Sequence, residues 1–589
     1  MSASAQIDSV LLDSTVISLR GISNTSSINA IQLNNKSSLG EVLTLESLVF
    51  VKPTGGNALS TISIRGGTPE QSPVFWNGLN LQNTLNGNID IALLPAFIFD
   101  AISINASAAT NSGSGVIAGS VELKNNKIDT IRSLKAIVGF GAFGLTNVAV
   151  KTIIPSDKST WSIAAFRRSA KNNYPYQTSS AKTKPLEHAR FDLSGVLIQN
   201  QLRFKNYSPL NIRLWWQQSN REIPATTLEA RSLKYQIDKS IRLQSDWSKV
   251  QGKNEWKFIF GSFNEQLKYR DSVANIYNDY LFSNNSALIH YKRLIESKLR
   301  LGVDLEGRFF GADADTFYNQ NRIELSEAIH LKHDNKNLQT HSGLRWVQFN
   351  GISEKPILFS FKANKKIDKS YSLSASFSTN YRLPTFNSLY WNPGGNPNLG
   401  PERSTNAEMQ LRFKRKDVIW TATAYSNYIQ DQMRWLPGND GIFAASQIVD
   451  QTQWNKGVET STQINLKRFL FIANGTIMKS NVVGDKRNLQ QTFVPQIQAN
   501  TSLRYNWSKW SVVYGNSFIG KRFVDADNEE FLPSISLHRL SVEATFKDVS
   551  FYATIQNLLN EYYTVLPFRP NQPRNFLLNI SYKILNNKK

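Results

Sequence analysis

The sequence predicts an all-β protein in which a small α+β domain precedes a large antiparallel transmembrane β-barrel. Two observations point to this fold class. From about Lys127 onward, segments of roughly ten residues alternate apolar and polar side chains, as in a sheet with one apolar and one wet face. No run of apolar residues reaches the roughly 18 to 20 residues that a spanning helix needs. Barrel strands cross lipid with near-average hydropathy, so the combination favours a barrel.

The composition excludes several classes of function. With 41% hydrophobic residues over 589 positions, the chain is not globally disordered. It has no cysteine, which excludes a disulfide scaffold, a Cys-ligated metal centre and a Cys nucleophile. The net charge of +22 comes from Lys and Arg scattered over the whole length, without a nucleic-acid motif. We therefore expect a basic solvated surface and no nucleic-acid partner.

The first domain extends to about Asn125 and is poor in Trp and Tyr. Apolar residues recur at helical spacing between Leu39 and Phe50, and Ser38 can cap this segment, which predicts a helix. Short apolar runs between Gly-rich turns predict strands at 60–64, 74–76, 101–104 and 120–123.

The second domain consists of predicted barrel strands with a lipid face and a lumen face. Alternation is clearest in 370–382 and recurs in 301–309, 540–547 and 576–584. The polar face of these strands is charged and amide-rich, which suits a wet lumen better than a dry core. The predicted apolar face of the first of them consists of Tyr371, Leu373, Ala375, Phe377 and Tyr381.

Aromatic residues cluster at the ends of these segments, as the girdles of a membrane barrel would at the two lipid–water interfaces. A large soluble β-propeller or jelly roll is the alternative, but the sequence shows no blade-length repeat. The aromatic pairs are Trp215 with Trp216, Tyr280 with Phe282, Tyr390 with Trp391, Trp507 with Trp510, and Tyr562 with Tyr563.

Motifs in both domains resemble those of the TonB-dependent outer-membrane receptors, in the order of that family and over nearly the whole chain. In the first domain they are Ile62–Gly67 (ISIRGG), Pro73–Leu81 (PVFWNGLNL), Leu94–Pro95, Ala101–Ile104 and Asn111–Val121 (NSGSGVIAGSV). In the second they are Tyr381–Trp391 (YRLPTFNSLYW), Gly395–Glu402 (GNPNLGPE), Gly457–Glu459, Gln556–Tyr563 (QNLLNEYY) and Pro573–Phe576.

The resemblance implies a 22-stranded barrel with the first domain as a plug inside it. It divides the chain into an N-terminal segment (1–20), a plug (21–126) and a barrel (127–589). It also implies a bacterial outer-membrane location. The segment Met1–Asp8 has no basic region and no apolar stretch, so it does not predict a signal peptide. Under this resemblance, we expect the sequence to be a processed or engineered form rather than a cytosolic protein.

The resemblance implies the energy transducer TonB as a partner, together with outer-membrane lipid and a large small-molecule ligand; a surface lipoprotein is left open. A β-rich segment ahead of the plug is the candidate TonB box, because an extended segment can add to a partner's sheet edge and transmit force. A plain linker is the alternative. The candidate residues are Leu12, Asp13, Ser14, Thr15, Val16, Ile17 and Ser18.

The resemblance places the ligand at two apical plug loops, where Gly allows close backbone approach and Asn supplies donors and acceptors. Ordinary turns are the alternative, since Gly and Asn are common in turns. Barrel aromatics could stack on the ligand, or anchor the barrel in the lipid interface. The candidates are Gly55, Gly56 and Asn57; Asn83, Thr84, Asn86 and Asn88; and Tyr390 and Trp391.

Arg65 is expected to hold the plug through a barrel carboxylate inside the lumen. The family often has Arg-Gly where this chain has Asn105-Ala106, so a second latch is expected to be missing. We expect no metal and no cofactor, with Asp313 and Asp315 as the candidates for a surface Ca²⁺ and a solvated acidic loop as the alternative. No catalytic arrangement stands out, so no enzymatic activity is expected.

The expected function is energy-coupled import of a scarce nutrient, and the segment 389–399 most resembles cobalamin receptors. A ferric-siderophore receptor is the alternative ligand class. A passive porin would need an open lumen, and a barrel enzyme would need convergent catalytic groups; both are alternatives from other classes.

Overall fold

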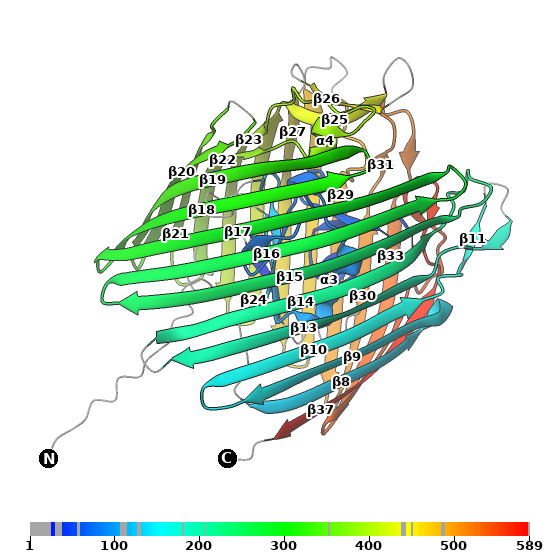
Figure 1. Cartoon of the computed structure of the whole chain (residues 1–589). Helices are drawn as coiled ribbons and strands as arrows, with labels where there is room; N and C mark the ends of the chain where they lie inside the picture. The colour runs from blue at the N-terminus through cyan, green and yellow to red at the C-terminus, as the bar shows by residue number, and fades with distance from the viewer. Residues whose placement is uncertain are drawn as a thin grey trace.

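The structure, a computed structural model, is a closed β-barrel whose lumen holds the N-terminal domain (Figure 1). The predicted domain boundaries after residues 20 and 126 fall outside the described residues and stay predictions. The described residues are 25–29, 38–55, 59–106, 115–125, 131–178, 182–204, 207–351, 354–437, 443–448, 452–483 and 489–586.

The barrel has 22 antiparallel strands, as predicted. Strands next to each other along the wall pair in register, and the last closes on the first, with Leu577 opposite Gly141. The strands are β8 (Arg132–Gly141), β9 (Leu145–Pro155), β10 (Ser159–Ala170), β13 (Phe191–Phe204), β14 (Tyr207–Ile223), β15 (Lys234–Gln251), β16 (Asn254–Asp271), β17 (Ile276–Glu296), β18 (Leu299–Ala314), β19 (Phe317–Asp334), β20 (Leu338–Phe349), β21 (Ile357–Lys366), β22 (Tyr371–Arg382), β23 (Glu402–Arg415), β24 (Val418–Gln430), β27 (Thr452–Leu466), β28 (Phe469–Val483), β29 (Ile497–Trp507), β30 (Trp510–Ile519), β33 (Ile535–Phe546), β34 (Val549–Gln556) and β37 (Asn575–Asn586).

Alternation along these strands separates the two faces of the wall. In β37, Phe576 is 55% exposed and Tyr582 is 45% exposed, whereas Asn579 between them is 3% exposed. Tyr381 at the end of β22 departs from the prediction, because it is buried at 1% exposure and its hydroxyl donates to Glu324. At this strand end the side chain turns into an aromatic contact inside the barrel, so alternation no longer sets its direction.

The predicted aromatic girdles are only partly correct. Trp507 and Trp510 lie on the outer face, 60% and 45% exposed. Trp216 also faces outward, but its neighbour Trp215 is fully buried in the lumen. Successive residues of a strand point to opposite faces, so two adjacent tryptophans cannot both face lipid. Tyr280 and Phe282 likewise point inward, where they pack against the plug.

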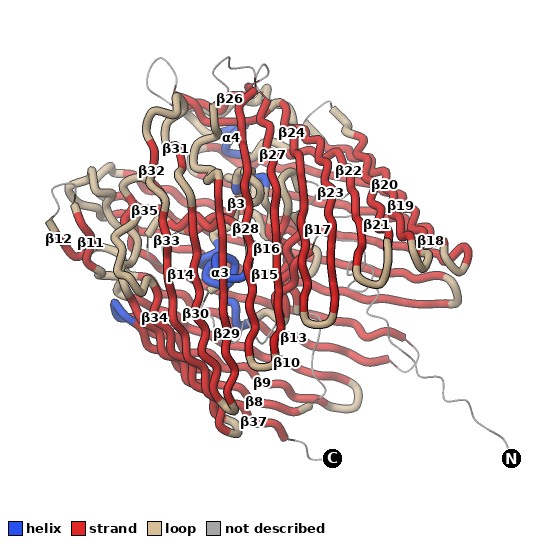
Figure 2. Tube along the Cα trace, turned by 180° about the vertical axis from the view of Figure 1, so that it is seen from behind, coloured by secondary structure: helices blue, strands red, loops and turns tan. Residues whose placement is uncertain are grey.

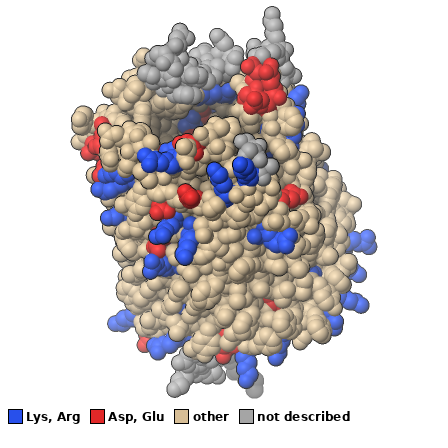
Figure 3. Space-filling view, turned by 90° about the vertical axis from the view of Figure 1, so that its right-hand side faces the viewer, with Lys and Arg blue, Asp and Glu red and all other residues tan. Residues whose placement is uncertain are grey.

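The two ends of the barrel differ. Short turns join the strands at one end, and the longer loops lie at the other (Figure 2). Outer-membrane barrels have short periplasmic turns and longer extracellular loops, so the long-loop end is extracellular. Figure 3 shows Lys and Arg spaced along the lower, short-turn rim. The longer loops carry α4 (Phe386–Tyr390) and the hairpins β11 (Pro175–Gln177)–β12 (Thr183–Pro185), β25 (Gln432–Pro437)–β26 (Phe443–Ile448), β31 (Arg522–Phe523)–β32 (Phe531–Leu532) and β35 (Thr564–Leu566)–β36 (Arg569–Pro570).

The plug is a small α+β domain. Its sheet has the order β1-β6-β7-β4-β5, with β4 and β7 parallel. Within the described residues, no helix combines the length and the hydropathy that crossing a membrane requires. The plug elements are β1 (Thr25–Asn29), α3 (Leu39–Glu46), β2 (Phe50–Pro53), β3 (Ser60–Ser63), β4 (Val74–Trp76), β5 (Leu79–Asn80), β6 (Ala101–Asn105) and β7 (Ser120–Lys124), with 3-10 turns at Pro69–Gln71, Ile91–Leu93 and Ala96–Ile98.

Helix α3 begins as predicted, with the Ser38 hydroxyl accepting from the Glu41 amide at 3.3 Å, but it ends earlier than predicted, at Glu46. Ser47 ends it: its hydroxyl donates to the Leu43 carbonyl and accepts from the Val49 amide. These local bonds replace the next helical turn, and strand β2 follows at Phe50.

One apolar core joins the plug to the barrel wall. Trp76 of the plug meets Trp215 of β14 edge-on, with ring centroids 5.4 Å apart. Phe99 contacts the same indole at 5.8 Å, and the Trp76 ring lies 6.0 Å from Phe263 of β16. The first domain therefore packs inside the cylinder and fills its lumen, instead of folding beside it.

Candidate functional site: the plug–barrel interface

Arg65 connects the plug to two barrel strands. Its guanidinium bonds Glu408 of β23 at 2.9 Å and Glu459 of β27 at 2.6 Å, and lies 4.2 Å from the Tyr425 ring centroid. It also donates to the Ala106 carbonyl at 3.0 Å, next to the predicted missing latch. Burial by itself lowers the pKa of Arg65, but the two glutamates outweigh it and raise the pKa above its ordinary value.

The backbone around Arg65 explains the ISIRGG motif. Arg65 and Gly66 both have left-handed φ angles, 48° and 78°. This places the Gly66 carbonyl where the Gln453 amide of β27 donates to it at 3.0 Å. A Cβ on Gly67 would lie 2.3 Å from the Cβ of Ala118, so this position has no room for a side chain.

A second polar junction centres on Glu402, which is fully buried at the start of β23. Its carboxylate accepts from Gln71 of the plug at 3.0 Å and from two nitrogens of Arg382, each at 2.8 Å. The backbone amide of Met433, at the base of the β25–β26 hairpin, donates to it at 2.8 Å. One carboxylate therefore ties together plug, wall and an extracellular hairpin. The sequence analysis placed Glu402 only in the GNPNLGPE motif and did not predict that its carboxylate joins the plug to the wall.

A third junction joins Asp90 of the plug to Arg221 of β14, which also pairs with Asp238 of β15 at 3.2 Å. Asp90 additionally accepts from the amides of Ser60 and Ala92, both at 2.9 Å. Three separate clusters of buried polar contacts thus hold the plug against different parts of the wall. A buried pair that loses one partner leaves an uncompensated charge, so each cluster resists displacement of the plug.

The apical loop 83–88 reaches the extracellular mouth and bonds a barrel loop. Its backbone folds on itself, since the amides of Asn83 and Gly87 donate to the carbonyls of Asn88 and Asn83, each at 3.0 Å. The amides of Phe386 and Asn387 in α4 donate to the Thr84 and Leu85 carbonyls at 3.1 and 2.9 Å. The structure therefore brings the predicted residues of this loop to the helix that carries Tyr390.

Tyr390 and Trp391 belong to the mouth and not to the lipid interface. Trp391 stacks on Tyr280 with centroids 6.3 Å apart, and Tyr390 lies 6.2 Å from Phe317. The lipid-anchor alternative is therefore wrong for this pair. Leu85 of the plug belongs to the same cluster, so plug and barrel share one aromatic floor beneath the long loops.

The other predicted loop approaches a different part of the wall. Gly55 follows β2 with φ at 129°, in a hairpin where the Thr54 amide donates to the Leu59 carbonyl at 2.9 Å. Phe50 of this hairpin packs on Ile519 and Ile535 of β30 and β33, away from the α4 cluster. Gly56, Asn57 and the candidate TonB box 12–18 lie outside the described residues.

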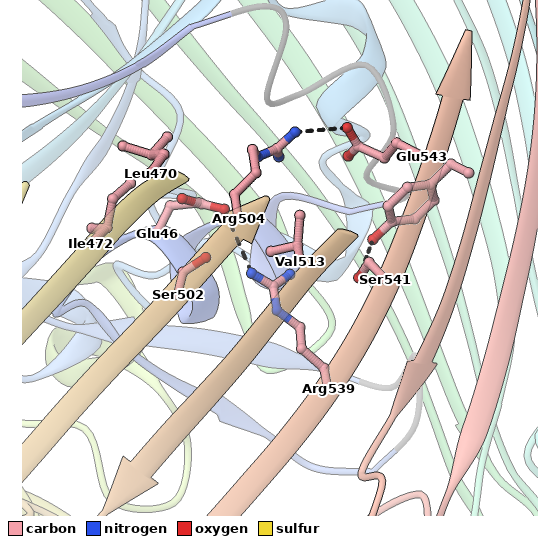
Figure 4. A pocket seen from close by; sticks show the side chains of 10 residues that line it. Glu46, Leu470, Ile472, Ser502, Arg504, Val513, Arg539, Ser541 and Glu543 are labelled. Carbon is pink, nitrogen blue, oxygen red and sulfur yellow. Dashed lines mark hydrogen bonds and ion pairs between the residues drawn. The ribbon is translucent and has the colours of Figure 1, made fainter. Parts of the chain in front are cut away.

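In the lumen, a small cavity of about 30 Å³ lies between Glu46 of α3 and the wall formed by β28, β29, β30, β33 and β34 (Figure 4). Glu46 at the end of α3 approaches Arg539 at 3.8 Å across this space. Arg504 and Glu543 pair at 2.8 Å on the wall itself. The plug–wall contact is longer here, at 3.8 Å, than the plug–wall contacts of the Arg65 and Glu402 junctions, which span 2.6 to 3.0 Å.

A histidine cluster in the lumen was also missed by sequence reasoning. Asp304 of β18 accepts from His290 at 2.9 Å and from His330 at 2.8 Å, and His341 lies beside His330. Only strand pairing brings these residues together. Among the described residues, no group of three or more His, Asp and Glu side chains has the geometry of a metal site.

The Ca²⁺ candidates each have a protein partner. Asp313 accepts from the Asn319 amide at 3.3 Å, and Asp315 accepts from the Asp279 amide at 2.7 Å. Both carboxylates therefore bond backbone amides of the neighbouring strands, and a cation at this place stays a prediction.

Family models match both parts of the chain. The model for the β-barrel of TonB-dependent receptor-like proteins matches residues 133–558, and the TonB-dependent receptor plug domain model matches residues 16–120. Two curated relatives are vitamin B12 transporters named BtuB. The one from Vibrio vulnificus is 25% identical over 71% of this chain and 68% of its own length, and the one from Photobacterium profundum is 22% identical over 94% and 91%.

Solved structures share the fold. The FrpB iron transporter of Neisseria meningitidis superposes with a TM-score of 0.82 at 12% identity, covering 96% of this chain and 100% of its own. The siderophore receptor PirA of Acinetobacter baumannii gives 0.80 at 13% identity over 96% and 99%. The unliganded ferric citrate transporter FecA gives 0.80 at 13% identity over 96% and 97%. At these identities the likeness concerns the fold alone.

Proposed function

The chain belongs to the TonB-dependent receptors of the bacterial outer membrane, and from this premise we propose that it imports cobalamin. The family makes it a TonB-dependent outer-membrane transporter. The observation that supports an energy-driven importer is the plug held inside the barrel by Arg65, Glu402 and Asp90. A lumen filled in this way passes a large solute only after work has moved part of the plug.

Cobalamin is proposed on the sequence relatives, since two curated relatives, at 25% and 22% identity, are vitamin B12 transporters. The mouth offers chemistry that suits a large ligand with polar edges and a flat face. Asn83, Asn86 and Asn88 carry side-chain amides, of which the Asn83 and Asn86 oxygens accept backbone amides of the same loop, and Trp391 packs in the cluster that contains Leu85 of this loop. Ferric siderophores are the second candidate, because solved structures with this fold include iron and siderophore receptors.

Binding of labelled cyanocobalamin and of ferric siderophores to the purified protein separates the two ligands. We expect saturable cobalamin binding and growth of a receptor-deficient strain on limiting cobalamin once this chain is expressed. Saturable binding of a ferric siderophore with no cobalamin binding would reject cobalamin and favour the second candidate.

In the proposed cycle, ligand contact at the mouth shifts the loop 83–88 and α4, which share backbone hydrogen bonds. The shift makes the segment 12–18 available to TonB, and pulling on that segment displaces part of the plug. Deletion of 12–18 should leave ligand binding intact and abolish uptake. Deletion of 2–8 is the matched control and should leave both intact. Normal uptake by the first variant would reject the assigned TonB box.

A further inference from the structure

A ring of exposed basic side chains surrounds the short-turn end of the barrel. Each short turn that the structure describes there carries an exposed Lys or Arg, in the turn or in the adjoining strand ends. We call these residues the basic rim: Lys158, Lys253, Arg293, Lys298, Arg300, Lys336, Lys365, Lys366, Lys369, Lys414, Arg415, Lys416, Lys467, Arg468, Lys509 and Lys547. Exposed acidic residues in the same places are fewer: Asp157, Glu296, Asp368, Asp417 and Asp548.

The opposite end of the barrel does not share this excess. Its exposed basic residues, such as Lys182 and Arg231, are accompanied by a comparable set of exposed acidic residues. These acidic residues are Glu187, Glu229, Asp313, Asp315, Glu354, Asp527, Glu529 and Glu530. The positive charge that is scattered along the sequence is therefore gathered at one end in space, because the chain returns to that end at every second strand connection.

Part of the rim points away from the lumen. Arg293 shares the outer face of β17 with Ile295, which is 43% exposed. Lys365 shares the outer face of β21 with Phe361, which is 40% exposed, and Arg415 ends the outer face of β23. The charges thus continue the apolar lipid-facing surface at its lower border.

Large apolar side chains mark that border. The ammonium of Lys509 lies 5.5 Å from the ring centroid of Phe546, which belongs to the outer face. An aromatic ring beneath a Lys is the arrangement by which long basic side chains keep their stems in apolar surroundings and their charge at the headgroups. Other exposed residues next to the short turns are Leu466 (58%), Phe469 (47%), Trp507 (60%) and Trp510 (45%).

We propose that the basic rim binds the phosphate groups of anionic phospholipids in the periplasmic leaflet of the outer membrane. The turns stand on the perimeter of the barrel, directly below the apolar belt, which is the depth of lipid headgroups. Each Lys or Arg near an anionic membrane surface adds attraction, and many together select anionic over zwitterionic lipid. The lipid ring so formed would fix the barrel at a set depth while TonB pulls on the plug.

The test compares lipid retention by the purified full-length protein and a rim variant, using native mass spectrometry in detergent with added dioctanoyl phosphatidylglycerol or dioctanoyl phosphatidylcholine. The variant changes two neighbouring turns: Lys414→Gln, Arg415→Gln, Lys416→Gln, Lys467→Gln and Arg468→Gln. A matched control removes the same charge at the long-loop end: Lys171→Gln, Lys182→Gln, Lys184→Gln, Arg190→Gln and Arg231→Gln. We expect phosphatidylglycerol retention to fall about fivefold in the rim variant and to stay unchanged in the control.

Several results would overturn the proposal. They are equal phosphatidylglycerol retention by the rim variant and the unmodified protein, an equal fall in the control, or equal retention of phosphatidylcholine. Loss of binding to an acidic periplasmic protein, with lipid retention unchanged, would assign the rim to that partner instead. If the rim variant does not fold, the salt dependence of lipid retention by the unmodified protein tests the proposal. Phosphatidylglycerol retention that does not weaken with added salt contradicts an electrostatic rim.

Discussion

Arg65 of the plug and Glu459 of the barrel wall, 394 positions apart in the chain, form a two-pronged ion pair inside the lumen. The Arg65 Nε–Glu459 Oε1 distance is 3.0 Å and the Nη2–Oε2 distance is 2.6 Å. Such a forked pair fixes direction as well as distance. With Glu408 as the second partner, it sets the position of the ISIRGG turn against β23 and β27.

Arg65→Gln should loosen the plug without unfolding the barrel. The substitution leaves the buried Glu408 carboxylate and the partly exposed Glu459 carboxylate without the Arg65 cation, which destabilises the plug–wall contact by about 3 kcal/mol. Hydrogen exchange of peptides covering 62–76 should rise, and channel openings should appear in planar bilayers. Arg167→Gln is the control, because its pair with Asp192 lies on the outside with the Arg167 side chain 69% exposed, and such pairs contribute little. Unchanged exchange in Arg65→Gln would contradict the latch.

Trp391→Ala should weaken ligand binding about tenfold, the loss that corresponds to about 1.4 kcal/mol of aromatic contact. Titration of labelled cobalamin measures this, with heat-modifiable gel mobility as the check that the barrel is intact. Trp510→Ala removes an indole from the lipid face and should leave the affinity unchanged. Equal affinity in both variants would assign Trp391 to packing against Tyr280 alone.

Lys52 should make plug stability depend on alkaline pH. Burial lowers the pKa of Lys52 from 10.5 to about 8, although Glu70 acts in the opposite direction. Below pH 8 the folded and unfolded states both hold the proton, so the full burial penalty of about 3 kcal/mol is present. Between pH 8 and 10.5 the folded state releases its proton first, and plug stability rises with pH.

Replacement by a neutral side chain removes this dependence. Lys52→Met should stabilise the plug most at pH 7 and progressively less as the pH approaches 10.5. The native chain has no cysteine, so a spin label at Thr54→Cys can report plug unfolding in urea for both proteins. A stability difference that is constant from pH 7 to 10.5 would contradict the shifted pKa.

The alternation of apolar and polar residues predicted which face of the wall most strand residues take. Residues such as Phe576 and Asn579 take the faces that their period-2 positions predict, because one face meets lipid and the other meets the lumen. The prediction that Trp215 and Trp216 belong to one girdle was wrong by the same rule, since adjacent residues of a strand cannot share a face. The extension of α3 to Phe50 failed for a different reason: Ser47 offers the backbone local hydrogen bonds that end the helix.

The sequence also indicated three segments that lie at the plug–barrel interface, namely the motif around Arg65, the loop 83–88 and the segment that carries Tyr390, and their role in ligand binding stays a prediction. It did not give their partners. Glu408, Glu459 and Glu402 lie hundreds of positions from the plug residues that they bind, and many lumen carboxylates would satisfy the same local pattern.

Local sequence thus determined the strands, their faces and the plugged-barrel class, because each depends on side-chain period and motif order within a short window. Only the tertiary structure decided which charges meet across the lumen, which aromatics form the mouth, and that the scattered lysines gather on one rim. Those contacts follow from barrel closure and strand register, which are properties of the whole ring.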